Sequence, residues 1–541
     1  TNNRCERGEI LGNPQDAGVR ARLQQINQAQ RPADLFALRR KLLFQPYPHP
    51  NLCAARGITI GLPRVLFFWD TMPFWQTFFS ALGFTVQLSD FSTRKMYESG
   101  LSAVTSDTVC FPAKLVHGHL RNLAAKNVDR IFFPSISTVP SENQEKTSES
   151  MCAVVKGYPF VIRNSDDFLK EAGIPLDAPL FHWYSDEDRT DQLVHYMQQT
   201  YGISAALTRA AITAGDKAQQ TFRREMQQAG QKVLDEVTRT GQYAVVLASR
   251  PYQTDTLVNH DLPAMLTGFG VPVLTVDSLP GLDDVPLDAS ALDIVNNYHA
   301  RMLESAVIAA RNPHLEYIQI VSFGCGHDAY LSDEITRLLR EIAGRTPLIL
   351  KLDESDVQGP LRIRVRSFLE TLNMRRAAGL SAEIHPLPDP YPVKFTAQDR
   401  KTRLVLVPNT SHAFCRVLSA AFAAQGLRTV PLELGREEAI RLGKQYVHND
   451  ICFPAQMVIG EVLAALQSGR YDTDHVAVAM AKYIGDCRLT HYSALLRKAL
   501  DDAGFANVPI LTNDDADSHN QHPGFRKNLL TSIRIAYAMP M

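Results

Sequence analysis

The sequence predicts an α/β protein built from several parallel-sheet, Rossmann-like lobes, with an internal repeat and a helical arm. Short β-branched or aromatic runs alternate with helix-length amphipathic segments, which is the pattern of parallel α/β domains. A strand-loop-helix unit at 58–88 has a second copy that starts at 403. The long polar stretch 204–240 carries few strand signals and favours one extended helix.

The first unit shows the expected elements in order. A strand over 58–68 leads into a loop at 70–73, a helix over 74–82 that stops at Gly83, and a second strand over 84–88. Further short apolar and β-branched runs predict strands at 130–133, 243–248, 273–276, 317–321 and 347–352. The second unit repeats this order, with a strand over 403–407, a helix through Ala421 and a strand over 429–432.

The chain is expected to divide into five segments. The stretch 204–240 predicts a helical arm that bridges two lobes, and the proline-dense stretch 381–395 predicts an extended linker. The expected segments are an N-terminal helical or linker segment at 1–50, a first lobe at 51–205, the arm at 206–240, a second lobe at 241–385 and a third lobe at 400–541.

Length, charge and hydropathy limit the class of protein. With 541 residues the chain needs several cores, and its net charge of −1 gives no basic footprint for nucleic acid. The sequence has no apolar run of about 18 residues that would predict a membrane span, and its first residues contain no apolar stretch, so no signal peptide is expected. Eight cysteines over this length do not suggest a secreted disulfide scaffold, so a cytoplasmic location is expected. The chain does not begin with Met, so we expect it to be a piece of a longer protein.

Two cysteines lie in copies of one motif. The pattern Ile/Val-Cys-Phe-Pro-Ala stands at 109–113 and at 451–455, with an Asp two or three residues before Cys110 and Cys452. Because Pro is tolerated just inside a helix start, Cys110 is expected near a helix N-terminus, where exposed N–H groups favour a thiolate. A buried apolar cysteine is the alternative, and the repetition at Cys452 favours the thiolate.

Cys325 lies in a different setting, between Gly324 and Gly326. It follows a strand and precedes a helix that is expected to begin near Ser332. Loops at the carboxyl edge of a parallel sheet are where α/β proteins bind ligands, and the two glycines permit close backbone approach and a positive φ. A plain turn is the alternative.

Cys152 and Cys487 are candidate partners of the repeated cysteines. Cys152 stands after Cys110 at a distance similar to that of Cys487 after Cys452. Cys415, by contrast, lies in an apolar helical run and is expected in a core.

Dispersed thiolates on strand-end loops suit an iron–sulfur cluster held between lobes. The sequence contains no Cys-x-x-Cys, so neither a zinc ribbon nor a ferredoxin-type run is expected. Soft thiolates select Fe–S, Zn or Cu(I), and three thiolates on a cubane would leave one iron open. We expect His117, His119 and His327 to donate to cluster sulfurs or to carry protons, which makes them candidate catalytic residues. Solvated surface histidines are the alternative.

An ordered series of motifs resembles the domain found in large activase-related proteins of the 2-hydroxyacyl-CoA dehydratase system. The resemblance runs from about residue 56 to 512, and its motifs stand at 60–66, 110–114, 157–159, 250–252, 324–329, 449–454 and 485–488. It implies a relative of dehydratase subunits that carry [4Fe-4S] clusters and of double-cubane cluster proteins. Such relatives receive low-potential electrons from an ATP-hydrolysing activator, often fused ahead of this region, and we expect this protein to be oxygen-sensitive.

The resemblance also implies the ligands. Cysteines at the positions of Cys110, Cys152 and Cys325 would hold a [4Fe-4S] or larger cluster. By analogy, Cys452 and Cys487 would belong to a second site, although no cysteine after Cys487 plays the part of Cys325.

The expected function is ATP-coupled low-potential electron transfer by an iron–sulfur redox protein. The protein would be an oxidoreductase or a component of a 2-hydroxyacyl-CoA dehydratase (lyase) system, with an activator domain or subunit as partner and a CoA thioester or a small unsaturated molecule as substrate. The sequence has no phosphate-binding or dinucleotide-binding glycine motif, so the ATPase would be another domain or chain. One alternative is a cluster-free scaffold that docks an activator ATPase; another is a zinc-thiolate enzyme, which the lack of His pairs at ligand spacing disfavours.

Overall fold

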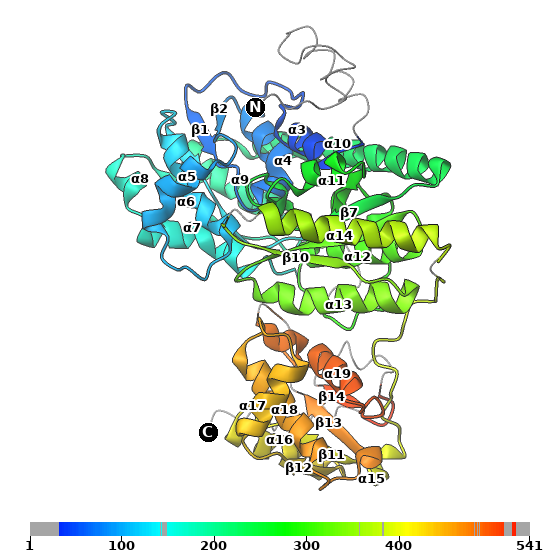
Figure 1. Ribbon diagram of the computed structural model, residues 1–541. Coiled ribbons are helices and arrows are strands. Elements are labelled where there is room, and N and C mark those ends of the chain that lie inside the picture. The colour runs from blue at the N-terminus through cyan, green and yellow to red at the C-terminus, as the bar shows by residue number, and fades with distance from the viewer. Residues whose placement is uncertain are drawn as a thin grey trace.

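The computed structural model describes residues 32–140, 142, 149–355, 358–380, 383–480, 482–483, 485, 487–512 and 522–525. These residues form three four-stranded sheets and one two-stranded sheet, in which every strand pair is parallel. Helices surround the sheets (Figure 1), which confirms the predicted α/β fold of Rossmann-like lobes.

We name the three lobes after their four-stranded sheets. Lobe I contains β1 (Thr59–Leu62), β2 (Thr85–Leu88), β3 (Arg130–Phe132) and β5 (Leu176–Asp177). Lobe II contains β7 (Ala244–Ala248), β8 (Val273–Leu274), β9 (Leu315–Ser322) and β10 (Leu348–Leu352). Lobe III contains β11 (Leu404–Val407), β12 (Arg428–Pro431), β13 (Val476–Met480) and β14 (Ile510–Thr512). The two-stranded sheet pairs β4 (Ser135–Thr138) with β6 (Leu180–His182).

The helices connect and cover these strands. Those before lobe II are α3 (Leu35–Phe44), α4 (Phe68–Ala81), α5 (Arg94–Gly100), η1 (Leu101–Ala103), α6 (Phe111–Ala124), α7 (Ala153–Ser165), α8 (Phe168–Glu171), α9 (Asp186–Tyr201) and α10 (Ala205–Thr240). Lobe II adds η2 (Pro251–Thr254), α11 (Leu262–Gly268), η3 (Val276–Ser278), η4 (Leu282–Asp284), α12 (Asn297–Arg311), α13 (Gly326–Ala343) and α14 (Gln358–Ala377). Lobe III adds α15 (Asp399–Thr402), α16 (His412–Ala424), α17 (Glu437–Tyr446), α18 (Phe453–Gln467), η5 (Thr473–His475), η6 (Arg488–His491) and α19 (Tyr492–Asp502).

The predicted internal repeat is confirmed by topology. The strand orders β2-β1-β3-β5 in lobe I and β12-β11-β13-β14 in lobe III are the same when the strands are counted within each lobe. The order β8-β7-β9-β10 in lobe II follows the same rule, so the part of the chain that the structure describes forms three lobes of one topology rather than two related halves.

Alternate residues of the lobe II strands face opposite layers of helices. Val245 and Leu247 pack in one core with apolar residues of α11 and α14. Val246 and Tyr317 belong to a larger core that includes α12 and α13 and continues into lobes I and III. Figure 1 shows α14 on one side of this sheet and α12 and α13 on the other. Burial on both faces explains the continuous apolar strands, since all eight residues of β9 are buried.

The expected strand over 58–68 and the expected loop at 70–73 are partly wrong. The strand β1 ends at Leu62, and α4 runs through the expected loop with Pro73 inside it. Pro73 has no N–H to bond the carbonyl of Trp69, and Arg39 Nη2 donates to that oxygen instead, at 2.8 Å. Arg39 is 1% exposed and lies in α3. A donor from another helix therefore stabilises α4 at its proline.

The helix expected near Ser332 begins six residues earlier, at Gly326. Glycine lowers helix propensity, which is why the sequence favours a loop there. In the structure the whole Gly-Cys-Gly stretch packs against other lobes, and that packing allows the helix to start directly after Cys325.

The predicted helical arm is confirmed as α10. Its Gln219 Nε2 donates to the carbonyl of Asp70 in α4, at 2.8 Å. Further along, Gly230 packs so tightly on η3 that a Cβ there would lie 1.7 Å from the Ser278 carbonyl oxygen. The arm therefore packs on lobe I and lobe II.

The structure describes only part of the predicted N-terminal segment and of the predicted linker between lobes II and III. Residues 1–31 of the predicted N-terminal segment 1–50 lie outside the described residues, and the remainder contains α3. In the expected linker, residues 383–395 have neither helix nor strand. Tyr391 Oη donates to the Ala291 carbonyl at 3.0 Å, so the linker is packed on lobe II.

Among the described residues, no helix combines the length and the apolar character needed to cross a membrane.

Candidate functional site

Each of the five candidate cysteines occupies the N-cap position of a helix. Cys110 precedes α6, Cys152 precedes α7 and Cys325 precedes α13. In lobe III, Cys452 precedes α18 and Cys487 precedes η6. The predicted position of Cys110 at a helix N-terminus is confirmed, and the same arrangement holds at all five positions. The alternative of a buried cysteine also holds for Cys110, which is 9% exposed. Helix N-termini present unpaired N–H groups and the positive end of the helix dipole, which favour thiolates over thiols.

The shared topology explains where these cysteines lie. In every lobe, a cysteine begins the helical segment between the third and fourth strands of the sheet: Cys152, Cys325 and Cys487. In lobes I and III a second cysteine, Cys110 or Cys452, begins the helix before the third strand. The matching N-cap in lobe II is Asn296, whose side chain accepts a hydrogen bond from the backbone N–H of His299.

Cys110, Cys152 and Cys325 come together between lobes I and II, and we call them the first thiol site. The three thiols interact electrostatically with one another. Arg250 and Tyr252, which follow β7 in lobe II, interact with thiols of the same site. Because all these residues follow strands or begin helices, they lie at the carboxyl edges of the two sheets.

Gly324 allows the two lobes to meet at this point. Its φ is 78°, and a Cβ there would lie only 2.3 Å from the backbone oxygen of Thr108, two residues before Cys110. Gly326 serves a second contact, since a Cβ there would lie 1.8 Å from the guanidinium carbon of Arg488 in lobe III. The expected close approach on both sides of Cys325 is therefore present, and lobe III covers this edge of the first thiol site.

A buried ion pair stands beside the three thiols. Arg250 is 2% exposed and its Nη2 lies 2.7 Å from Oδ1 of Asp328, which is 1% exposed. Although burial alone would lower it, Asp328 holds the pKa of Arg250 well above its usual value. The buried Nη1 of Arg250 has no hydrogen-bond partner among the described residues. An unused cationic N–H at this position fits an anionic group held by the thiols.

At Cys110 and Cys325 burial outweighs the helix N-termini and keeps the thiols protonated unless something binds them. Burial raises the pKa of the Cys110 thiol to about 12, and the neighbouring Cys152 thiol adds to the rise. Burial also raises the pKa of Cys325, while Arg250 opposes that rise. Binding of a metal group would therefore release protons from these residues.

Cys452 and Cys487 form a second thiol site in lobe III. Both interact with Tyr492 in α19, whose hydroxyl lies 3.0 Å from Cys452 Sγ. Cys487 is exposed, unlike Cys110. No cysteine follows Cys487 in the sequence to complete this pair as Cys325 completes the first thiol site.

Aromatic rings connect the two sites. Tyr330, five residues into α13, contacts His491 of η6 with ring centroids 3.9 Å apart. His327 Nδ1 is paired with the Tyr330 hydroxyl, and the rings of His299 and His327 lie 5.3 Å apart. Sequence reasoning missed Tyr330, His299 and His491. The only available signal for Tyr330 and His491 was their position about one helical turn after a candidate cysteine.

The predicted catalytic histidines lie in different environments. His117 is 0% exposed, with Nδ1 2.7 Å from Asp166 Oδ2 and Nε2 3.2 Å from Tyr158 Oη. Tyr158 interacts electrostatically with Cys110, so His117 reaches the first thiol site through that ring. His327 lies beside the ring contact between the two sites. The surface alternative is wrong for His117.

His119 is also buried, so the surface alternative is wrong for it too. It is 0% exposed, with Nδ1 2.7 Å from Ser89 Oγ and Nε2 2.9 Å from Ser92 Oγ. Burial lowers the pKa of His119 to about 3, and Arg64 contributes in the same direction. The role of His119 as a proton carrier remains a prediction.

The low pKa of His119 should make the protein acid-sensitive. An unfolded His takes up a proton near pH 6.5, whereas folded His119 stays neutral to about pH 3, so the unfolded state binds more protons between these values. The contribution of His119 to the free energy of unfolding is therefore fully present above pH 6.5. As the pH decreases below 6.5, this contribution decreases by about 1.4 kcal/mol per pH unit. Urea unfolding at pH 7 and pH 5 should show a weaker pH dependence for His119→Asn. His475→Asn, at an exposed His, should retain the wild-type dependence, and equal slopes in all three proteins would contradict the prediction.

Among the described residues, no group of three or more His, Cys, Asp or Glu side chains is placed to hold one metal ion. That finding concerns single ions, because a cluster attaches each thiolate to a different iron. The N-cap cysteines, the burial and the unpartnered Arg250 Nη1 fit a cluster at the first thiol site.

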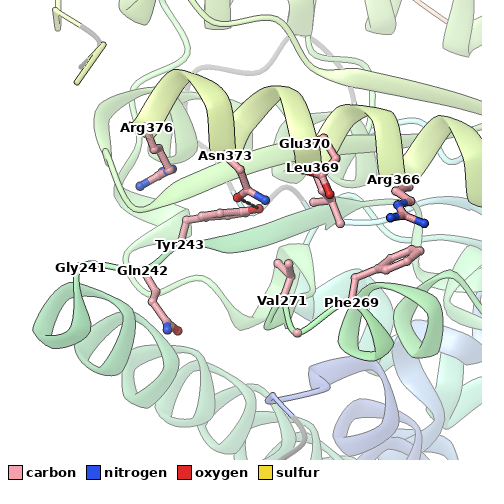
Figure 2. Close-up of a pocket in the computed structure, with 11 residues that line it drawn as sticks. Gly241, Gln242, Tyr243, Phe269, Val271, Arg366, Leu369, Glu370, Asn373 and Arg376 are labelled. Carbon is pink, nitrogen blue, oxygen red and sulfur yellow. Dashed lines mark hydrogen bonds between the residues drawn. The ribbon is translucent and has the colours of Figure 1, made fainter. Parts of the chain in front are cut away.

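A wide cavity of about 620 Å³ lies far from this chemistry. Figure 2 shows it between α14 and the start of β7, where the Tyr243 hydroxyl points toward Asn373. Gly241 and Val271, which line it, precede β7 and β8, so the cavity opens at the amino edge of the lobe II sheet. The thiols lie at the carboxyl edge, where parallel sheets carry their functional groups.

Fold and site define a three-lobed parallel α/β protein with helix-capping cysteines at its sheet edges. Residues 59–279 match the family described as CoA enzyme activase uncharacterised domain (DUF2229). The chain thus contains an activase-related region, which includes Cys110 and Cys152 and ends before Cys325. A search of curated proteins found no match.

Proposed function

We propose that this protein is an iron–sulfur redox protein that holds a cluster through Cys110, Cys152 and Cys325 and takes part in ATP-coupled low-potential electron transfer. The observation that carries the proposal is the meeting of three helix-capping cysteines beside the buried, partly unpartnered Arg250. When bound, a [4Fe-4S] cluster would supply one-electron chemistry at a potential set by charge, hydrogen bonds and solvent exposure.

The chain's own residues would control that potential. Cys110 is 9% exposed and Arg250 is 2% exposed, whereas Cys152 and Cys325 are half-buried, so one side of the first thiol site is poorly solvated and holds the Arg250–Asp328 ion pair. Helix N-termini add oriented N–H groups near each thiolate. Lobe III limits access from solvent because Arg488 packs on Gly326.

An activator ATPase is the proposed partner, and the activase-related region supports it. Exposed aromatic side chains flank the candidate cysteines. Phe323 is 56% exposed two residues before Cys325, and Phe453 is 52% exposed directly after Cys452. Lys351 links their neighbourhoods, since it lies over the Phe323 ring and pairs with Asp450. Large exposed aromatics next to redox ligands favour a docking surface for the activator.

Iron and acid-labile sulfide in protein purified without air test the proposal. Wild-type protein should contain about four irons per cubane with a broad visible absorption band, and Cys325→Ser should lose most of that iron. Cys415→Ser is the matched control, because Cys415 is buried in a separate core within α16 and should leave iron unchanged. Absence of iron after anaerobic reconstitution, or full iron in Cys325→Ser, would contradict the assignment.

For lobe III, one observation favours the alternative of a cluster-free docking module. Only Cys452 and Cys487 meet there among the described residues, and the Cys452 thiol is already paired with the Tyr492 hydroxyl. Iron that stays unchanged in Cys452→Ser would support that role for this lobe, and loss of a second set of irons would assign it a cluster.

A further inference from the structure

A pocket beside the first thiol site lies between lobe I, the arm and α12. It has a volume of about 370 Å³, and we call it the aromatic pocket because Phe74, Trp75, Trp183 and Tyr298 line it. The Trp75 and Trp183 rings are stacked with centroids 6.2 Å apart. Flat aromatic walls of this kind bind planar apolar groups.

Two contacts connect this pocket to the thiols. Tyr298 interacts electrostatically with Cys152, and its ring lies against that of Tyr252, with centroids 6.1 Å apart. Tyr252 in turn interacts with all three thiols. Met151, which also lines the pocket, directly precedes Cys152. The pocket and the first thiol site therefore share a wall.

Some polar atoms of the pocket lining are buried and have no hydrogen-bond partner in the described part of the chain. Trp183 Nε1 and Tyr298 Oη are buried and have no hydrogen-bond partner among the described residues, and these residues are 6% and 3% exposed. Gln219 Nε2 is bonded to the Asp70 carbonyl, which leaves Gln219 Oε1 as a buried acceptor without a partner. Leaving buried polar groups unpaired costs free energy, so a ligand that pairs them gains affinity.

The charges that line the pocket are already neutralised. Arg301 binds Glu142 through Nε at 2.7 Å and Asp70 through Nη1 at 2.9 Å. Arg189 binds Asp216 through two bonds of 2.9 Å. Arg223, the third arginine in the lining, also pairs with Glu142. Each lining arginine of the described structure is thus paired with a carboxylate, so Arg189 Nε, which is buried without a hydrogen-bond partner, brings no uncompensated positive charge to attract a carboxylate or a phosphate.

Size further restricts the ligand. A cavity of about 150 Å³ encloses a benzene ring, so about 370 Å³ accommodates a substituted ring. The nucleotide and pantetheine arm of a CoA thioester are far larger than this space and carry phosphates.

We propose that the aromatic pocket binds a small, uncharged, planar amide, with its ring between the aromatic walls, its carbonyl accepting from Trp183 and Tyr298, and its N–H donating to Gln219. The role of this ligand as the substrate at the thiols rests on the proposed function, whereas its binding does not depend on iron.

Benzamide is the probe, measured by isothermal titration calorimetry on the full chain with and without reconstituted iron. Saturable binding in the millimolar range is expected, weakened about fivefold in Trp183→Phe and in Tyr298→Phe, which keep the rings and lose one donor each. Benzoate, which adds a charge without a free cation to meet it, should bind at least about tenfold more weakly. Tyr243→Phe, in the cavity at the other sheet edge, should bind benzamide like wild type.

Three results would overturn the proposal: no saturable benzamide binding, unchanged affinity in both pocket variants, or tighter binding of benzoate than of benzamide. If benzamide binds to protein that takes up no iron on reconstitution, the proposal for the aromatic pocket stands and the proposed iron–sulfur function is wrong. Iron content as expected without benzamide binding would do the reverse.

Discussion

Replacing Asp328 by Asn should lower the free energy of unfolding by about 3–5 kcal/mol, the cost of leaving one partner of a buried ion pair uncompensated. Arg250 is 2% exposed and has Asp328 as its carboxylate partner at 2.7 Å. The substitution keeps the shape of the side chain. In the wild-type protein Asp328 Oδ2 accepts a hydrogen bond from the Ser322 N–H at 2.9 Å, and the amide oxygen of Asn can still accept this bond. The expected loss therefore reports the charge rather than a cavity. Urea unfolding of iron-free protein at pH 7 measures it.

The matched control is an exposed pair of the same kind. Glu438 and Arg441 lie 2.7 Å apart on the surface of lobe III, and Glu438→Gln should leave the unfolding midpoint unchanged. If the free energy of unfolding of Asp328→Asn decreases by less than about 1 kcal/mol, Arg250 is not left as an uncompensated buried charge, and the prediction is wrong. If an anionic cluster lies beside Arg250, loading with iron and sulfide should recover part of the lost stability in Asp328→Asn.

The sequence predicts the fold class well because each lobe repeats the same local signals. Short apolar strands, helix-length segments and the repeated Cys-Phe-Pro-Ala motif are local features, and the structure confirms the fold, the repeat and the arm. The fourth strands of lobes I and III were missed because they are short, only two residues in β5 and three in β14.

Other features depend on contacts that no local pattern contains. Pro73 predicts a break in the helix. The helix α4 nevertheless continues, because Arg39, far away in sequence, donates the hydrogen bond to the Trp69 carbonyl that Pro73 cannot donate. The structural counterparts of Cys325 are Cys152 and Cys487, and the sequence does not reveal this because the kinship of lobe II with the other lobes is visible in strand order and not in sequence motifs. The contact between Tyr330 and His491 joins lobes II and III, and it follows only from their packing.

The second large effect is expected at Gly324, where backbone conformation and lobe contact coincide. In Gly324→Ala the new Cβ would lie 2.3 Å from the Thr108 carbonyl oxygen, at a residue whose φ is 78°. The strain of the left-handed conformation costs about 1–2 kcal/mol, and the clash with backbone adds to it, so the Cys325 loop must move away from lobe I. Cys325 would then lose its position beside Cys110 and Cys152. We expect lower stability together with a loss of most bound iron after anaerobic reconstitution.

Gly344→Ala separates these two causes. Gly344 has a φ of 61° at the end of α13, and a Cβ there would meet no atom within 4 Å. This variant carries the left-handed strain of Gly324→Ala without its clash, so it should lose about 1–2 kcal/mol of stability and keep its iron. Equal iron in the two variants would mean that the approach of Gly324 to Thr108 does not position Cys325. Iron lost only in Gly324→Ala would identify this lobe contact as the feature that assembles the first thiol site.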